Sequence, residues 1–445
     1  MRFIKVLAMV VCILVMPSIA KANIYDNYKE ARIEYISALV SLAAYSDRLG
    51  VIAREELAEA GWFMRPYNKN FAGVDARFFI VENDEIEPGR EIYILAVTGT
   101  ESVSDVKVDI NFNKVFFGGN NPQQFIKEAG KKNLTSQDPM VHRGFNRYAQ
   151  TAFFFNDNNG ETLGEHLVNI LKEQPNRLLY MSGHSLGGAV ATLAAARLIA
   201  MGAPADQIKV ISFGAPAIGN ETFARKYGDQ INLDRIVIAG DPIRGVLQSI
   251  SGGYMQFGKY QEWQDHRNEL EKSHSIAVYT DAALRNYYDA RLQLNEYDNA
   301  SISVKLAANP NNLKVYVAPI AFAGKNLLNG DEYYMQMALD DFAQRTLPGA
   351  ILGKQRSSNL SDELAKAANN GCQWLIMPSV NVQKMRNKQD TLYIDYVEEV
   401  YEVASGELKS GISQASSTYQ LTPIQAILYG SAKARETCLQ TIGAL

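Results

Sequence analysis

Hydrophobic residues recur along this chain at two spacings, one typical of helices and one typical of strands. From Tyr28 to Leu49 apolar residues recur every three or four positions, which predicts an amphipathic helix. Short apolar runs then alternate with further helical segments as far as residue 239. Strands are expected at 77–81, 92–97, 177–180, 209–213 and 235–239, and helices at 161–173, 189–200 and 221–227. This alternation predicts a mostly parallel sheet with helices on both faces.

The pattern changes in the last third of the chain. Residues 296–312 are mostly polar and rich in asparagine, so we expect a linker there. The segments that follow predict strands at 313–319, 372–382 and 391–404 and from 412 onward, with helices at 331–347, 362–369 and 423–442. Residues 313–445 are therefore expected to form a small α+β domain. Their pattern resembles small envelope domains of the TolB amino-terminal type.

The first 22 residues have the pattern of an export signal. Two basic residues precede an apolar run from Val6 to Met16, and the small residues Ala20 and Ala22 suit cleavage after Ala22. The apolar run is too short to span a bilayer comfortably. We expect a Sec-type signal peptide and a mature chain that is periplasmic or secreted. A retained membrane anchor is the alternative.

Composition narrows the expected partners. The formal net charge of −4 among 445 residues argues against a nucleic-acid partner. Two cysteines remain after signal cleavage, Cys372 and Cys438, and an oxidising compartment would allow them to pair without requiring it. Residues 313–445 contain no histidine, no cluster of metal ligands and no glycine-rich phosphate loop. We expect no cofactor and no metal, while a protein partner for residues 313–445 stays open.

The clearest chemical motif is centred on Ser185. Gly183 and Gly187 give it the G-x-S-x-G spacing of a nucleophile elbow, between a predicted strand and a predicted helix. The amide of Leu186 then lies at a helix N-terminus, where it can donate to an oxyanion. Thr100, after the strand at 92–97, is the candidate for the second donor. The alternative is a serine in an ordinary glycine-rich turn.

A serine nucleophile needs a histidine base, and this chain has only five histidines. We favour His274, which follows the serine and lies where a loop meets a predicted helix. The others precede the serine, lie in polar stretches or are expected to point away from it: His142, His166, His184 and His266.

The acid that orients the histidine is expected to be Asp241. It follows the buried strand at 235–239 directly, and Pro242 fixes the turn after it. Carboxyl ends of parallel strands lie at the same edge of a sheet, so Asp241 and Ser185 should be neighbours. Asp234 belongs to the opposite edge, while Asp206 and Asp229 lie in polar turns.

Several ordered motifs together resemble the class 3 (fungal-type) lipases, a group of α/β-hydrolases. The motifs are Thr98-Gly99-Thr100, His142-x-Gly144-Phe145, Gly183-His184-Ser185-Leu186-Gly187-Gly188, Phe213-Gly214-Ala215-Pro216, Asp241-Pro242, and His274 with a tyrosine five residues later. The resemblance implies an α/β-hydrolase domain over residues 23–295, a Ser185–Asp241–His274 triad, and an oxyanion hole formed by Thr100 and Leu186. It also implies a lid in the segment after Asp109.

The function expected on these grounds is that of an exported serine lipase or phospholipase. It would cleave carboxylic esters of acyl glycerols or phospholipids at a membrane or lipid surface. Residues 111–140 are expected to be a long polar insertion, either a lid over the site or a surface excursion. The alternative function is that of a catalytically silent envelope protein that binds a partner on a hydrolase scaffold.

Overall fold

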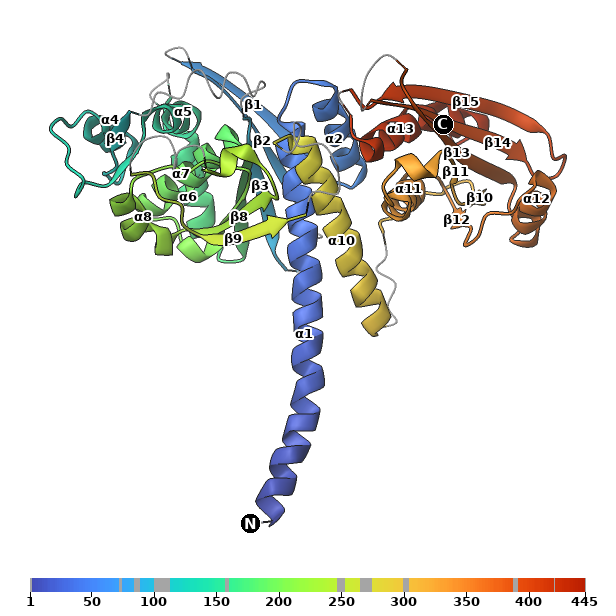
Figure 1. Ribbon diagram of the computed structural model, residues 1–445, viewed down its shortest axis with the longest axis horizontal. Helices are drawn as coiled ribbons and strands as arrows, with labels where there is room; N and C mark the ends of the chain where they lie inside the picture. Colours follow the sequence, from blue (N-terminus) through green and yellow to red (C-terminus); the bar gives the residue numbers. More distant parts are fainter. Residues whose placement is uncertain are drawn as a thin grey trace. The chain divides into compact units, whose positions relative to one another are not determined.

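The computed structural model describes residues 2–71, 74–83, 89–99, 113–156, 160–245, 253–264, 274–298, 304–386, 391–419 and 421–444. The chain divides into two compact units (Figure 1). One is Glu34–Ala282, and the other combines Met1–Ile33 with Ala283–Leu445. Among the helices of the described residues, none combines the length and the hydropathy needed to cross a bilayer.

A seven-stranded sheet forms the centre of Glu34–Ala282. Its strand order is β1-β2-β3-β6-β7-β8-β9; β1 to β3 are antiparallel, and β3 to β9 run parallel. The strands are β1 (Phe63–Phe71), β2 (Val74–Asn83), β3 (Glu91–Val97), β6 (Arg177–His184), β7 (Ile208–Phe213), β8 (Asn232–Ile238) and β9 (Lys259–Trp263). The five predicted strands are confirmed, whereas β1 and β9 were not predicted.

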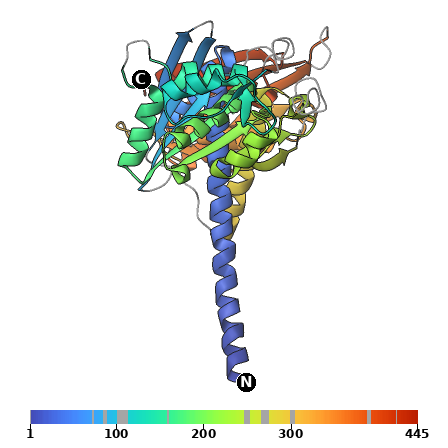
Figure 2. The same ribbon diagram turned by 90° about the vertical axis from the view of Figure 1, so that its left-hand side faces the viewer.

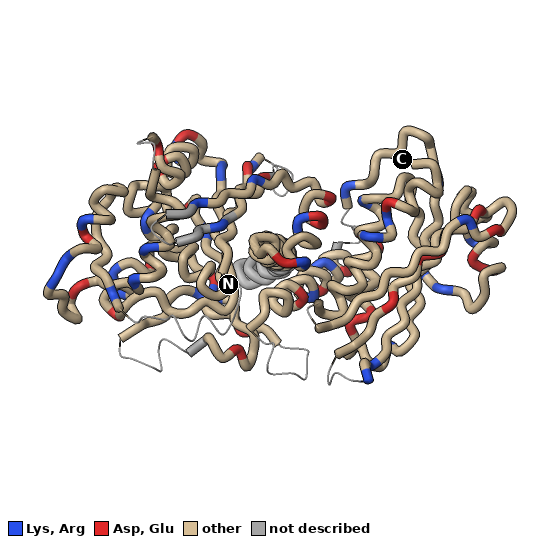
Figure 3. The backbone as a smooth tube through the Cα atoms, turned by 90° about the horizontal axis from the view of Figure 1, so that it is seen from above, with Lys and Arg blue, Asp and Glu red and all other residues tan. Residues whose placement is uncertain are grey.

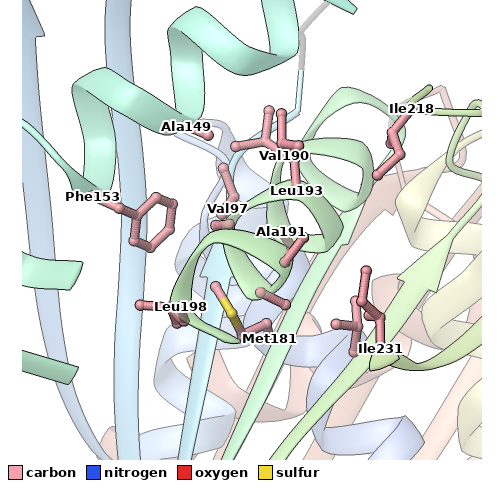
Figure 4. Close-up of a cluster of buried hydrophobic side chains, with 14 of the residues drawn as sticks. Val97, Ala149, Phe153, Met181, Val190, Ala191, Leu193, Leu198, Ile218 and Ile231 are labelled. Carbon is pink, nitrogen blue, oxygen red and sulfur yellow. The ribbon is translucent and has the colours of Figure 1, made fainter. Parts of the chain in front are cut away.

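Helices cover both faces of this sheet. Helix α7 lies on one face, where Val190, Leu193 and Leu198 pack among the same buried cluster as Met181 of β6 and Phe153 (Figure 4). The end of α1 and the start of α10 lie on the other face, since Ser41 contacts Ser182 and Tyr279 contacts Phe213. The helices are α1 (Arg2–Ala43), α2 (Arg48–Glu59), α4 (Pro122–Ala129), α5 (Arg143–Phe153), α6 (Leu163–Glu173), α7 (Leu186–Ala200), α8 (Glu221–Tyr227) and α10 (Ile276–Asp298), with short 3₁₀ turns η1 (Ala205–Gln207), η2 (Gly228–Gln230) and η3 (Pro242–Gly245).

Helix α1 is longer than the sequence pattern predicted. The expected helix covered residues 28–49, but the structure has one uninterrupted helix ending at Ala43 (Figure 2) and a separate α2 beginning at Arg48. The side chain of Asp47 caps α2 by accepting from the amide of Gly50 at 3.0 Å. A capping aspartate of this kind favours the start of a new helix over continuation of the old one.

The described part of the expected insertion, residues 113–140, is folded onto the sheet unit. Its β4 (Lys114–Phe116) pairs with β5 (Met140–His142), and the side chains of Phe117 and Phe125 are buried. The guanidinium of Arg197, on α7, lies 3.9 Å and 4.2 Å from the centres of those two rings. The described part of the polar insertion therefore carries a short strand and a helix, and two buried aromatic side chains attach it to the sheet unit. The first residues after Asp109, where the expected lid begins, lie outside the described residues.

The unit containing Ala283–Leu445 is built on a second sheet. Strands β12-β10-β13-β14-β15 are neighbours in that order, and β11 also pairs with β13. Cys438 lies in one buried cluster of this unit and Cys372 in another, and both are free thiols. The elements are β10 (Val315–Val317), β11 (Ala321–Ala323), η5 (Lys325–Leu327), α11 (Glu332–Thr346), β12 (Ala350–Leu352), α12 (Leu360–Asn369), β13 (Trp374–Lys384), β14 (Leu392–Glu402), β15 (Leu408–Ser417) and α13 (Pro423–Thr441).

Charges are mixed along the backbone of each unit. Basic and acidic residues follow one another at short intervals in the described part of the chain (Figure 3). The fold class follows from the sheet and from the serine turn between β6 and α7: Glu34–Ala282 has the α/β-hydrolase fold with a mostly parallel central sheet, and a separate sheet domain follows it.

Candidate active site

Ser185 lies at a sharp turn between β6 and α7. Its backbone has φ 55° and ψ −125°, a conformation that residues other than glycine rarely adopt. The turn brings two backbones very close. A Cβ atom on Gly183 would lie 2.4 Å from the carbonyl carbon of Gly187, and one on Gly187 would lie 2.1 Å from the carbonyl oxygen of Val97. Only glycine fits at these two positions, which is why the sequence motif has them.

The structure brings Ser185, His274 and Asp241 into one hydrogen-bonded chain. Nε2 of His274 lies 2.9 Å from Oγ of Ser185, and Nδ1 of His274 lies 2.8 Å from Oδ2 of Asp241. The three residues are at most 5% exposed. An imidazole placed between a hydroxyl and a carboxylate can take the hydroxyl proton, while the carboxylate fixes its tautomer.

The carboxylate of Asp241 has two further donors. Oδ1 accepts from the amide of Ile243 at 2.8 Å, and Oδ2 accepts from the hydroxyl of Tyr279 at 2.5 Å. Burial and the negative charge of Asp241 raise the pKa of Tyr279 well above its ordinary value of 10.0, so this hydroxyl stays protonated and keeps donating. The carboxylate is thus held by three donors.

The three residues come from three places in the chain. Ser185 follows β6, Asp241 follows β8, and His274 lies two residues before the start of α10. Strands β6, β7 and β8 are parallel neighbours, so their carboxyl ends share one edge of the sheet. The first turns of helix α10 place the hydroxyl of Tyr279 against Asp241.

The two expected oxyanion donors differ in what the structure describes. Leu186 is the first residue of α7, so its amide has no acceptor within the helix. That amide is available at the turn that carries Ser185. Thr100 lies outside the described residues, and its role as the second donor stays a prediction.

The remaining histidines have other surroundings. His142 caps α5 by accepting from the amides of Gly144 and Phe145. His166 lies at the surface, 3.5 Å from Glu161, and His266 is outside the described residues.

His184 is the residue that the sequence analysis missed. Its ring centre lies 4.6 Å from that of His274, and its Nδ1 lies 2.9 Å from the hydroxyl of Tyr45. The sequence predicts that its side chain points away from Ser185, whereas the structure places its ring against that of His274. Burial, and then the proximity of His274, lower the pKa of His184 well below its ordinary value, so it is neutral near pH ~7.

The side chains that could bind a metal ion are scattered in both units. Within either unit taken by itself, no three His, Cys, Asp or Glu side chains of the described residues converge as a metal site requires.

Comparison with known proteins gives a family match over part of the chain. Residues 94–247 match the family model described as Lipase (class 3). The chain is 36% identical over 91 residues to the secreted mono- and diacylglycerol lipase A of Penicillium cyclopium, covering 20% of this chain and 29% of that protein. It is 35% identical over 103 residues to the secreted mono- and diacylglycerol lipase 1 of Fusarium solani, covering 23% of this chain and 29% of that protein.

The matched segment thus spans less than a third of the length of these curated relatives. Among solved structures, a propeptide complex of Rhizomucor miehei lipase has a TM-score of 0.41 and 17% identity. That match covers 57% of this chain and 77% of the other.

Proposed function

We propose that this chain, in which residues 94–247 match the class 3 lipase family model, is an exported serine ester hydrolase acting on glycerol lipids. The observation that carries the proposal is the hydrogen-bonded series Asp241–His274–Ser185 at a strained turn. A backbone held at positive φ on a serine is unfavourable unless the surrounding structure enforces it, and such strain is concentrated at functional sites.

The first half of the reaction forms an acyl-enzyme. Oγ of Ser185 attacks the ester carbonyl carbon while Nε2 of His274 takes the hydroxyl proton. The amide of Leu186 donates to the oxyanion of the tetrahedral intermediate, and Thr100 is proposed to supply a second donor. When the intermediate collapses, His274 returns the proton to the leaving alcohol, and the acyl group stays on Ser185.

The second half releases the fatty acid. His274 takes a proton from a water molecule, which attacks the acyl carbonyl, and the same donors hold the oxyanion. Collapse of this intermediate breaks the bond to Ser185, and the serine oxygen recovers its proton from His274. Throughout both halves the carboxylate of Asp241 accepts from Nδ1 of His274 and stabilises the imidazolium, while Tyr279 and Ile243 donate to the same carboxylate.

The substrate class rests on the similarity to lipases. Relatives named mono- and diacylglycerol lipases favour neutral acyl glycerols as the substrates of this chain. Phospholipids are a second proposed class, cleaved by the same chemistry at the same ester carbonyl. Export is proposed from the signal-like first 22 residues and from relatives named as secreted.

The test compares the mature protein with Ser185→Ala on emulsified diacylglycerol, on vesicles of phosphatidylcholine and on a soluble chromogenic ester. Loss of the nucleophile is expected to lower kcat by on the order of 10⁴ to 10⁶ on each substrate that is cleaved. An alkyl phosphonate that esterifies serine should label the native protein and leave the variant unlabelled. Equal hydrolysis by both proteins refutes the proposal.

The three substrates separate the lipid classes. Release of fatty acid from diacylglycerol alone assigns the neutral-lipid activity, whereas release from phosphatidylcholine as well adds the phospholipase activity. Labelling of Ser185 without hydrolysis of any ester supports the alternative, a binding protein on a hydrolase scaffold. Fractionation of the producing cells checks export, which is refuted if the full-length chain with residues 1–22 stays in the cytoplasm.

A further inference from the structure

Two pairs of side chains join β6 to the end of α1 and to the turn that follows it. Oγ of Ser41 lies 2.9 Å from Oγ of Ser182, and the hydroxyl of Tyr45 lies 2.9 Å from Nδ1 of His184. Ser41 lies in the last turn of α1 and Tyr45 in the turn directly after it, while Ser182 and His184, two residues apart, share one face of β6. The two contacts are therefore successive steps of one interface, and the second step ends beside the triad.

The backbone around Tyr45 is held in several ways. Its amide donates to the carbonyl of Leu42 at 3.0 Å, and its carbonyl accepts from the guanidinium of Arg54 at 3.1 Å. A Cβ atom on Gly99 would lie 2.6 Å from the tyrosine hydroxyl, so the loop after β3 passes directly over it. Tyr45 is only 7% exposed, so its side chain is held in place by packing and its hydroxyl lies against the imidazole of His184.

The surroundings of His184 require it to be neutral. Its ring is 5% exposed and lies 4.6 Å from the ring of His274, at an interplanar angle of 38°. During the proposed reaction His274 becomes an imidazolium. A second positive charge at that separation would disfavour the charged state by a factor of roughly 10² to 10³ at the effective dielectric of a protein. A neutral ring packs against the imidazolium without this repulsion.

We propose that Tyr45 and His184 act together as positioning residues for His274. The tyrosine hydroxyl donates to Nδ1 of His184, which leaves the proton of this neutral imidazole on Nε2 and fixes the direction of its ring. The fixed ring then forms one wall against which His274 is held toward Ser185 and Asp241. This inference rests on the proposed function, since it assigns a role in the same triad.

The chain offers a matched control for the test. Tyr45→Phe and Ser41→Ala each remove one buried hydrogen bond to β6, from the turn after α1 and from the last turn of α1. Ser182 keeps the carbonyl of Ile211 as a partner at 3.0 Å, and Ser41 does not touch the triad. The two variants should therefore lose similar thermal stability. We expect kcat on a soluble chromogenic ester to fall about ten-fold in Tyr45→Phe with KM unchanged, and to stay native in Ser41→Ala. Only the former substitution allows the ring of His184 to move and so loosens the position of His274.

A double-mutant cycle distinguishes positioning from simple packing. His184→Phe keeps a ring beside His274 and removes both nitrogens. If Tyr45 acts through His184, then Tyr45→Phe combined with His184→Phe should lower kcat no further than His184→Phe alone. Multiplicative losses in the double variant, or the same kcat in Tyr45→Phe as in Ser41→Ala, would overturn the proposal.

A spectroscopic readout keeps this inference separate from the proposed function. The proton between Nδ1 of His274 and Asp241 should give a downfield signal in the proton NMR spectrum, whether or not the protein hydrolyses esters. We expect this signal to shift or broaden in Tyr45→Phe and to stay at its native position in Ser41→Ala. An unchanged signal in both variants refutes the positioning role. If the native protein hydrolyses no ester but the NMR signal changes as expected, only the proposed function is refuted.

Discussion

Replacing Tyr279 by phenylalanine removes the hydroxyl that contacts the carboxylate of Asp241. That hydroxyl donates to Oδ2 of Asp241 at 2.5 Å and accepts from the amide of Ile238 at 3.2 Å. Neither partner gains access to water, because the side chain of Asp241 is 0% exposed and Ile238 is buried. The substitution therefore leaves a carboxylate with one donor fewer and an amide without this acceptor.

The magnitude follows from these two contacts. A hydrogen bond to a charged group contributes about 1.5–3 kcal/mol, and an unsatisfied buried amide costs about 1–3 kcal/mol. Burying phenylalanine instead of a hydroxyl offsets part of this. We expect the free energy of unfolding at neutral pH to fall by about 2–4 kcal/mol. Because Asp241 keeps its bonds to His274 and Ile243, kcat should fall only about ten-fold, far less than on loss of a triad residue.

The pH dependence has a definite sign. The pKa of Tyr279 in the folded protein is raised well above its ordinary 10.0 by burial and then by the charge of Asp241. Its stabilising effect is complete below the unfolded pKa and is lost as the pH rises toward the folded pKa. Above pH ~10 this one group lowers the free energy of unfolding by about 1.4 kcal/mol per pH unit. Phenylalanine lacks this dependence. Above pH ~10 the difference in free energy of unfolding between the native protein and the variant therefore narrows by that amount per pH unit.

Urea unfolding of both proteins at neutral pH and in steps above pH ~10 measures the gap directly. Circular dichroism in the far ultraviolet follows the transition, and hydrolysis of the chromogenic ester is measured beside it. The reasoning is refuted by a variant as stable as the native protein at neutral pH. It is also refuted by a gap that stays constant as the pH is raised above ~10.

Three further predictions concern neighbouring parts of the fold. Gly187→Ala places a Cβ atom 2.1 Å from the carbonyl oxygen of Val97, so we expect loss of soluble folded protein, and a native melting temperature would contradict this. Arg197→Met removes two hydrogen bonds of a buried guanidinium and should lower the free energy of unfolding by about 2–3 kcal/mol. Limited proteolysis should then cleave residues 117–130 first. A native digestion pattern would show that Arg197 does not hold this segment in place. Asp241→Asn should lower kcat by on the order of 10³ to 10⁴ with little change in KM. Steady-state kinetics measure both constants, and an unchanged kcat would contradict this prediction.

Much of the fold was predictable because it is encoded locally. The spacing of apolar residues indicates strands and helices within a few residues, so β2, β3, β6, β7 and β8 were predicted from the sequence. Strands β1 and β9 were not, since Phe63–Phe71 and Lys259–Trp263 carry many polar residues at the two ends of the sheet. A strand of this composition becomes a strand because it pairs with a neighbour, which local spacing does not show.

The three residues proposed as the triad were predictable for a different reason. The elbow motif fixes one of them, and the order of elements fixes the edge of the sheet at which the other two are expected. The small number of histidines left few candidates for the base. The hydrogen bond from Tyr279 was not predicted, although a tyrosine at that spacing from His274 was noticed as part of the motif.

The sequence by itself determined the parallel sheet, the position of the serine turn and the three side chains that meet there, because each depends on short-range spacing and on chain order. Only the tertiary structure decided what surrounds His274. The contact between Tyr45 and His184 joins positions 139 residues apart, and the packing of Phe117 against α8 depends on how a segment folds back onto the sheet unit. Contacts of this kind depend on the register and packing of whole elements, which no local pattern of apolar residues specifies.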